Sequence, residues 1–365
     1  MEQILPERPE RFGFGFMRLP MLGEQVDIPQ TKRMVDTFLD SGFCYFDTAH
    51  GYLNGQSELA IRECLTSRYP RERYILTNKL SNNFFQSRED IRPLFRQQLE
   101  ACGVDYFDFY LMHAQSAQRF AKYKATGAYE TALELKAEGK IRHLGISFHD
   151  SPEVLEQILT EYPQIEAVQL QFNYLDYDDP KVQSRGCYEV CCRHGKPVFV
   201  MEPVKGGTLV QLPPRAQRIF DGLGGGTNAA YAIRFAAGFP AVRMVLSGMS
   251  TLEQVRQNTA LMKHFCPLSS REQEAITQVR AVLRDQGKIP CTRCSYCTEV
   301  CPMGIPIPEL FERLNEKRRT GTSDVSDLPG AKPSACRKCG KCEESCPQHL
   351  KIRELLQTAE AELGL

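Results

Sequence analysis

The chain has 365 residues, of which 42% are hydrophobic and 25% are charged, as in an ordinary globular protein with room for one large and one small domain. Its 45 basic and 45 acidic residues cancel, which argues against nucleic acid or an anionic membrane surface as a partner. Residues Met1–Arg8 lack the apolar core of a signal peptide, and no eighteen apolar residues follow one another. We therefore expect a cytoplasmic protein with no nucleic-acid or membrane partner. Its fifteen cysteines favour metal or redox chemistry over disulfides.

Short apolar runs alternate with amphipathic helical stretches from about residue 13 to residue 263. The first run begins at Phe12, and a helix over 31–41 is expected to end at Gly42. A second apolar run then ends at Asp47. Further strands are predicted over 74–79, 106–113, 143–147, 167–171, 197–202 and 242–247.

Helix-start signals stand between these strands. Asp90 is the expected N-cap of one helix, with Pro93 in its first turn, and Ser151 with Pro152 opens another. Ser250 with Glu253 has the spacing of a capping box. Other helices are expected over 127–137, 181–194 and 227–239. Eight strand–helix units of this length predict an α/β fold, a (β/α)8 TIM barrel, whose active site would lie at the carboxyl ends of the strands.

Polar residues occur where the predicted strands end. A single buried histidine is more often a satisfied core residue, and a single strand-end lysine usually reaches solvent. Several such groups converging on one rim, with Tyr52 in the loop above, favour a functional site. These residues are Asp47, Lys79, His113, Ser147, Gln169 and Ser247.

These residue types suit proton transfer to a carbonyl. The unperturbed pKa of a tyrosine is about 10, and the ammonium of Lys79 would lower the pKa of Tyr52 by favouring the phenolate. Asp47 can hold Lys79 in place, and His113 can orient the substrate oxygen. The set contains no strong nucleophile, so acyl or phosphoryl transfer fits less well.

The pattern Asp47-Thr48-Ala49-x-x-Tyr52, followed by Lys79 and His113 at the next strand ends, resembles the catalytic tetrad of the aldo/keto reductases. The resemblance covers roughly residues 12–262. It implies that Tyr52 is the general acid/base and that a nicotinamide cofactor lies extended across the barrel mouth. It further implies carboxamide contacts from Ser147 and Gln169, a pyrophosphate loop at 203–209 that includes Gly206 and Gly207, and an adenine contact from Asn258.

The chain departs from the family pattern at several cofactor positions. Met201 stands where an aromatic residue usually stacks on the nicotinamide, and Gly248 and Gln254 replace the usual lysine and arginine of the 2′-phosphate clamp. We expect Met201, Ser247 and Gln254 to belong to the cofactor site. NADP(H) and NAD(H) both stay open as the nucleotide. A flavin is a further alternative for which the chain holds no specific motif.

A different pattern begins after residue 288. Cys291-x-x-Cys294-x-x-Cys297-x-x-x-Cys301-Pro302 recurs with identical spacing as Cys336-x-x-Cys339-x-x-Cys342-x-x-x-Cys346-Pro347. In two-cluster ferredoxins the fourth cysteine of each motif reaches the other [4Fe-4S] cluster. We therefore assign the first cluster to Cys291, Cys294, Cys297 and Cys346, and the second to Cys336, Cys339, Cys342 and Cys301. A pair of structural zinc sites is the alternative, disfavoured by the third cysteine, the proline and the duplication.

The cysteine-rich segment is expected to be a separate, mainly helical domain. A helix over 268–284 and a linker over 285–288 precede it, and a helix over 308–318 separates its two motifs. This arrangement resembles the aldo/keto reductase subgroup with a C-terminal ferredoxin-type domain. The expected domains are a barrel over 1–265, a helix and linker over 266–288, and a two-cluster domain over 289–365.

Two functions from different classes follow. The first is an NAD(P)-dependent oxidoreductase that acts on a small carbonyl or alcohol and is coupled to or accompanied by two [4Fe-4S] clusters. The second is a redox-responsive electron-transfer module whose barrel binds nucleotide without significant turnover. Arg337 and Lys338 would attract an acidic soluble electron carrier, although such charges are commonly just a solvated face.

Overall fold

The computed structural model describes residues 11–284 and 287–365, so the expectations on Met1–Arg8 and on the first half of the linker lie outside the described residues. The chain packs as two compact units. The first comprises 11–178, 183–203 and 230–269, and the second comprises 179–182, 204–229 and the described residues from 270 onward. The loop and helix that follow the seventh predicted strand therefore pack with the C-terminal segment.

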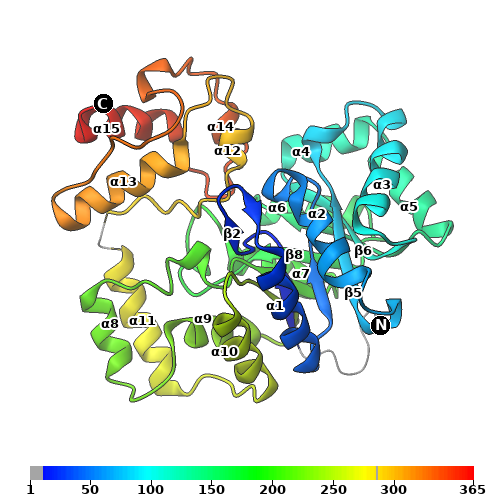
Figure 1. Ribbon diagram of the computed structural model, residues 1–365, viewed down its shortest axis with the longest axis horizontal. Coiled ribbons are helices and arrows are strands. Elements are labelled where there is room, and N and C mark those ends of the chain that lie inside the picture. The colour runs from blue at the N-terminus through cyan, green and yellow to red at the C-terminus, as the bar shows by residue number, and fades with distance from the viewer. Residues whose placement is uncertain (1–10, 285–286) are drawn as a thin grey trace. The chain divides into compact units, whose positions relative to one another are not determined.

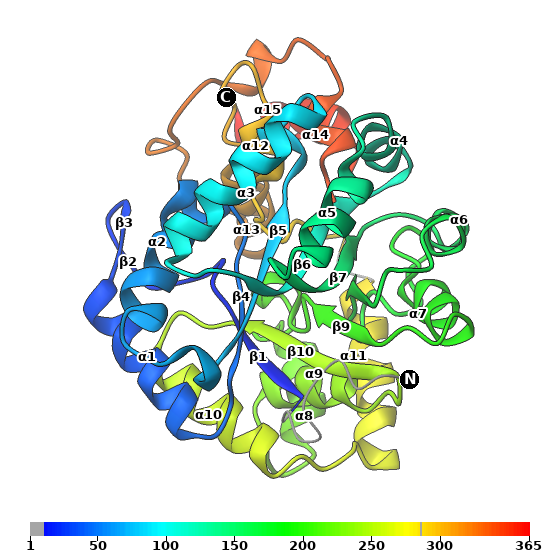
Figure 2. The same ribbon diagram turned by 90° about the vertical axis from the view of Figure 1, so that its right-hand side faces the viewer.

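The first unit is a closed barrel of parallel strands, as the alternating pattern predicts. Its hydrogen-bonded order is β1-β10-β9-β8-β7-β6-β5-β4, and Figure 2 shows these strands ringed by helices. The strands are β1 (Phe12–Gly15), β4 (Tyr45–Asp47), β5 (Ile75–Leu80), β6 (Phe107–Gln115), β7 (Ile141–Phe148), β8 (Ala167–Gln171), β9 (Val198–Met201) and β10 (Val242–Gly248).

Large side chains from strands all around the barrel fill its interior. Tyr45, Phe109 and Phe199 pack on one another, with ring centroids 5.1–6.0 Å apart. Gly13 makes room for this packing, because a Cβ there would lie 2.6 Å from the Leu246 side chain. The interior is thus a packed core, and only the strand ends can carry chemistry.

Helices α1 to α7, α9 and α10 surround the barrel. Ser87 caps α3, and Asp90 is the third residue of its capping box, so the prediction of Asp90 as N-cap was wrong by three positions. Pro93 consequently lies inside the helix, beyond its first turn. At α10 the cap is Thr251 and not Ser250. The helices are α1 (Ile28–Asp40), α2 (Gln56–Ile61), α3 (Arg88–Cys102), α4 (Ala117–Ala125), α5 (Ala128–Ala137), α6 (Pro152–Glu161), α7 (Ser184–Arg193), α9 (Asn228–Ala237) and α10 (Leu252–Lys263).

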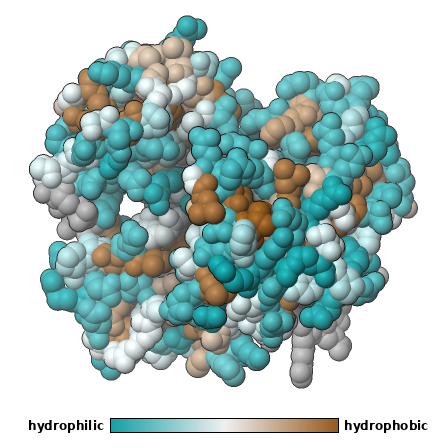
Figure 3. All heavy atoms as spheres, viewed as in Figure 1, coloured by the Kyte–Doolittle hydropathy of each residue, from teal (hydrophilic) through white to brown (hydrophobic). Residues whose placement is uncertain are grey.

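A short hairpin, β2 (Met21–Leu22) and β3 (Gln25–Val26), follows the first barrel strand. It exposes two apolar side chains, Met21 at 39% and Leu22 at 66%. Brown side chains gather in this part of the face shown in Figure 3.

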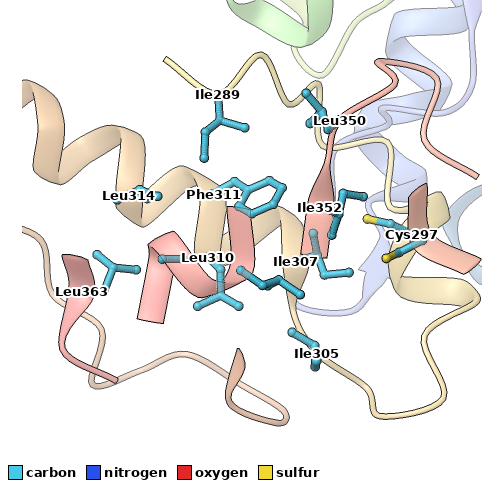
Figure 4. Close-up of a cluster of buried hydrophobic side chains, with 13 residues drawn as sticks. Ile289, Cys297, Ile305, Ile307, Leu310, Phe311, Leu314, Leu350, Ile352 and Leu363 are labelled. Carbon is cyan, nitrogen blue, oxygen red and sulfur yellow. The ribbon is translucent and has the colours of Figure 1, made fainter. Parts of the chain in front are cut away.

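The second unit is helical, as expected for a ferredoxin-type domain of this length. Helices α13 and α15 pack along each other, and Figure 1 shows both among the orange and red segments. Phe311 of α13 is fully buried in the apolar core between them (Figure 4), and the cysteines Cys297 and Cys342 belong to the same core. The helices are α8 (Pro214–Asp221), α11 (Ser270–Arg284), α12 (Tyr296–Glu299), α13 (Ile307–Thr320), α14 (Lys341–Glu344) and α15 (Ile352–Leu363).

None of the helices in the described part of the chain is long and apolar enough to cross a membrane.

Candidate active site and cysteine cavities

A buried ion pair links the ends of two neighbouring strands. Asp47 is the last residue of β4, and Lys79 is the penultimate residue of β5. The Lys79 ammonium donates to Asp47 Oδ1 at 2.6 Å and to the Thr48 carbonyl at 2.7 Å, and neither charged side chain is more than 6% exposed. Gln169 of β8 donates to the other carboxylate oxygen at 3.1 Å. The pair is therefore held from three strands.

Tyr52 lies beside this pair. Its backbone N–H donates to the Ala49 carbonyl at 3.0 Å. The next two residues, Leu53 and Asn54, take left-handed conformations that turn the chain sharply. The Lys79 ammonium lies 4.8 Å from the centre of the Tyr52 ring, and the His113 ring stands edge-on to it with centroids 5.8 Å apart. The structure thus brings together the four side chains that the sequence singles out.

The charges of this site depend on burial. Burial lowers the pKa of Lys79, while the carboxylate of Asp47 opposes that shift. Burial also lowers the pKa of His113 to well below its usual 6.5, and the nearby positive charges of Lys79 and Arg119 add to the effect. His113 is therefore neutral at neutral pH.

Ser81 is a site residue that the sequence analysis missed. Its hydroxyl lies 2.6 Å from Nδ1 of His113, within hydrogen-bonding distance, and fixes the orientation of the ring. The sequence offers only a weak signal, a serine two residues after Lys79 at the strand end.

The predicted nicotinamide contacts lie at the ends of adjacent strands. Ser147 of β7 and Gln169 of β8 are register partners, and both are buried. The Ser147 hydroxyl accepts from the backbone N–H of Ala114 at 2.6 Å. Both side chains therefore already have partners within the barrel, so any ligand contact would add to these bonds.

The remaining predicted cofactor residues lie on several different elements. Ser247 of β10 is buried at its strand end, and Met201 at the end of β9 is half-buried. Gln254 is exposed, and its side chain accepts from the N–H of Ser250 at 2.7 Å. Asn258 lies on the buried side of α10. Gly206 and Gly207 belong to the second unit.

The eight motif cysteines line two cavities of the second unit. In each cavity, three cysteines come from one motif and the fourth comes from the other, as the spacing predicts. The first cavity is lined by Cys291, Cys294, Cys297 and Cys346. The second cavity is lined by Cys301, Cys336, Cys339 and Cys342.

The donor chemistry of both cavities fits iron–sulfur clusters. Burial raises the pKa of the Cys291 and Cys342 thiols to about 11, so bound iron would have to stabilise the thiolates. Backbone N–H groups face the sulfurs, such as that of Lys338 at 3.4 Å from Cys336 Sγ. Among the described residues, no three His, Cys, Asp or Glu side chains are close enough to share a single metal ion. The cysteines of each set surround a space.

The structure thus combines a closed parallel (β/α)8 barrel, with Tyr52, Lys79, Asp47 and His113 grouped at its strand ends, and a segment with two four-cysteine cavities. Family models match both parts: the aldo/keto reductase family over residues 11–281 and a 4Fe-4S dicluster domain over residues 290–350. The chain belongs to the aldo/keto reductase family.

Curated relatives resemble the barrel portion. The NADH-specific methylglyoxal reductase of Escherichia coli is 29% identical over 198 residues, which is 48% of this chain and 57% of the relative. The 9,11-endoperoxide prostaglandin H2 reductase of Trypanosoma cruzi is 27% identical over 52% of this chain and 64% of its own length. The chain thus matches less than two thirds of the length of these relatives.

Solved structures share the barrel fold. An aldo-keto reductase from Klebsiella pneumoniae in complex with NADPH superposes with a TM-score of 0.61 at 20% identity, covering 74% of this chain and 90% of that one. The holo form of an aldo-keto reductase from Bacillus halodurans gives a TM-score of 0.59 at 25% identity, covering 74% and 91%.

Proposed function

We propose that the barrel catalyses reversible hydride transfer between a nicotinamide nucleotide and a small carbonyl or alcohol, with Tyr52 as general acid/base. The observation that supports this proposal is the grouping of Tyr52 with the buried Lys79–Asp47 pair and neutral His113. A phenol beside a buried ammonium suits this role, because the positive charge stabilises the phenolate that proton transfer leaves.

Each side chain has a separate task in this proposal. The Tyr52 hydroxyl gives its proton to the carbonyl oxygen, and the positive charge of Lys79 stabilises the phenolate that this leaves. Asp47 keeps Lys79 charged and in place through the 2.6 Å contact. Neutral His113, whose ring is oriented by Ser81, would contact and orient the same oxygen. The nucleotide, when bound, supplies or accepts the hydride.

The residues proposed to hold the nucleotide follow the family pattern. Ser147 and Gln169 would contact the carboxamide, Gly206 and Gly207 the pyrophosphate, and Asn258 the adenine. The names of the relatives include both an NADH-specific enzyme and an NADPH complex, and the replaced phosphate clamp at Gly248 and Gln254 does not select between the two nucleotides.

We propose that each cysteine cavity holds one [4Fe-4S] cluster and that each cluster transfers one electron at a time. Arg337, Lys341 and Arg353 line the second cavity, and Cys339 is exposed. Among the described residues that line the first cavity, none is charged. A soluble acidic carrier would therefore meet the second cluster first. Because nicotinamide transfers two electrons at once, an internal route between nucleotide and cluster would need a converter such as a flavin.

The substitution Tyr52→Phe tests the catalytic proposal. In anaerobic, cluster-loaded protein, methylglyoxal reduction with NADH or NADPH should fall by about 10²- to 10⁴-fold in kcat/KM, because the general acid is lost. Nucleotide binding and dithionite reduction of the clusters should be unchanged. Full turnover in Tyr52→Phe would refute the assignment. If the unmodified protein binds nucleotide but turns over no carbonyl, the redox-responsive module becomes the better description.

A further inference from the structure

The loop after β9 contains a buried lysine, Lys205, in a left-handed conformation with φ of 48°. Only 2% of its surface is exposed, and its ammonium donates to the side-chain oxygen of Gln348 at 2.6 Å, across 143 positions of the chain. Lysines are seldom buried without a specific partner, because removing the charge from water is costly. Gln348 follows Cys346, a lining residue of the first cavity, by two positions.

The same loop also approaches the other chain segment of the first cavity. At Gly206, with φ of 59°, an added Cβ would lie 2.6 Å from the carbonyl oxygen of Thr292. Thr292 directly follows Cys291. The loop is therefore packed against both segments that contribute cysteines to the first cavity. A Cβ at Gly207 would meet no atom within 4 Å, so the next position in the loop is open.

The Lys205 charge lies next to the lining of the first cavity. Gln348, which accepts the hydrogen bond from the Lys205 ammonium, is itself a lining residue of this cavity. A positive charge at this position favours the reduced cluster, which carries one more electron than the oxidised cluster.

We propose that Lys205 tunes the reduction potential of the cluster in the first cavity, and that nucleotide binding at Gly207 changes this potential. The second half rests on the proposed nicotinamide function, because only the resemblance to the family implies a pyrophosphate contact at this loop. The coupling is reciprocal: the oxidised and reduced proteins bind nucleotide with affinities that differ by the same factor.

An EPR-monitored redox titration of the cluster-loaded protein tests the first half. Lys205→Met should lower the reduction potential of one cluster by about 59 mV. For a one-electron couple this is about a tenfold fall in the ratio of reduced to oxidised cluster at a given solution potential. Lys205→Arg should retain the original potential. Lys351→Met is the matched control, because Lys351 is a 74%-exposed lysine near the same motif, and it should leave both potentials unchanged. Iron content is measured for each variant. If Lys205→Met binds less iron, Lys205→Gln takes its place. Two unchanged potentials after loss of the charge would overturn the proposal.

ADP-ribose, which carries the pyrophosphate but no nicotinamide, tests the second half. At saturation ADP-ribose should lower the reduction potential of the same cluster, so that the ratio of reduced to oxidised cluster at a given solution potential falls at least threefold. ADP-ribose should bind the oxidised protein more tightly than the reduced protein by the same factor. Bound ADP-ribose that leaves the potential unchanged would overturn the coupling. Absence of ADP-ribose binding would overturn both the coupling and the proposed nucleotide site, but not the result for Lys205→Met. Failure in the Lys205 variants alone would leave the Tyr52→Phe result intact.

Discussion

The buried Lys79–Asp47 pair allows a quantitative test of how the barrel tolerates charge. Lys79→Met leaves a buried carboxylate with Gln169 as its side-chain donor, and Asp47→Asn leaves a buried ammonium without its counter-ion. Each single change should lower the free energy of unfolding of the barrel by about 3–5 kcal/mol, because one uncompensated charge remains inside. The double variant should lose less than the sum, with a coupling of about 2 kcal/mol or more, because no charge is left unpaired.

The assay must report on the barrel alone, since a chain of two units does not unfold in one step. Native-state hydrogen exchange followed by mass spectrometry, read on peptides from β4, β5 and β6, gives this local free energy. Additivity of the two single changes to within about 0.5 kcal/mol would refute the reasoning. All three variants should lose carbonyl reduction, so activity cannot replace the exchange measurement.

Two further predictions concern other residues. His113→Asn should make the barrel less sensitive to acid: in the unmodified protein the unfolded state binds a proton near pH 6.5 while folded His113 stays neutral, so stability falls by up to about 1.4 kcal/mol per pH unit below pH 6.5. Hydrogen exchange at pH 7.5 and 5.5 checks this, and equal losses in both proteins would contradict it. Gly206→Ala should lower the stability of the second unit by at least about 1–3 kcal/mol, because a Cβ there would strain the backbone and clash with Thr292. Thermal release of iron measures the loss, and Gly207→Ala, with no clash, should cost less.

Most of the barrel could be predicted because its strands are buried on both faces. All nine residues of β6 are buried, and the apolar run over 109–112 within it was a sufficient signal. Helix starts were harder. Ser87, Asp90, Ser250 and Thr251 are all plausible caps by composition, and only the backbone hydrogen bonds decide between them.

The sequence could predict which residues belong to the candidate site, but not which of them contact one another. Strand-end positions identified Asp47 and Lys79, because parallel strands end at one rim. The bond from Gln169 to Asp47 spans 122 positions, and that from Lys205 to Gln348 spans 143. No local pattern encodes such long-range pairs. The exchange of fourth cysteines was predictable only because the motif is duplicated with the same spacing.

The crossed arrangement of the cysteines also constrains how the protein is made. Cys291, Cys294 and Cys297 are synthesised before Cys346, so the first cavity lacks one of its four cysteines until the second motif is translated. In the second cavity the order is reversed: Cys301 is synthesised first, and the other three cysteines belong to the later motif. Neither four-sulfur site can be completed from a partly synthesised segment. The proposed clusters would therefore be inserted only after both motifs are translated, and a chain truncated between the motifs would retain the barrel strands but could complete neither four-cysteine cavity.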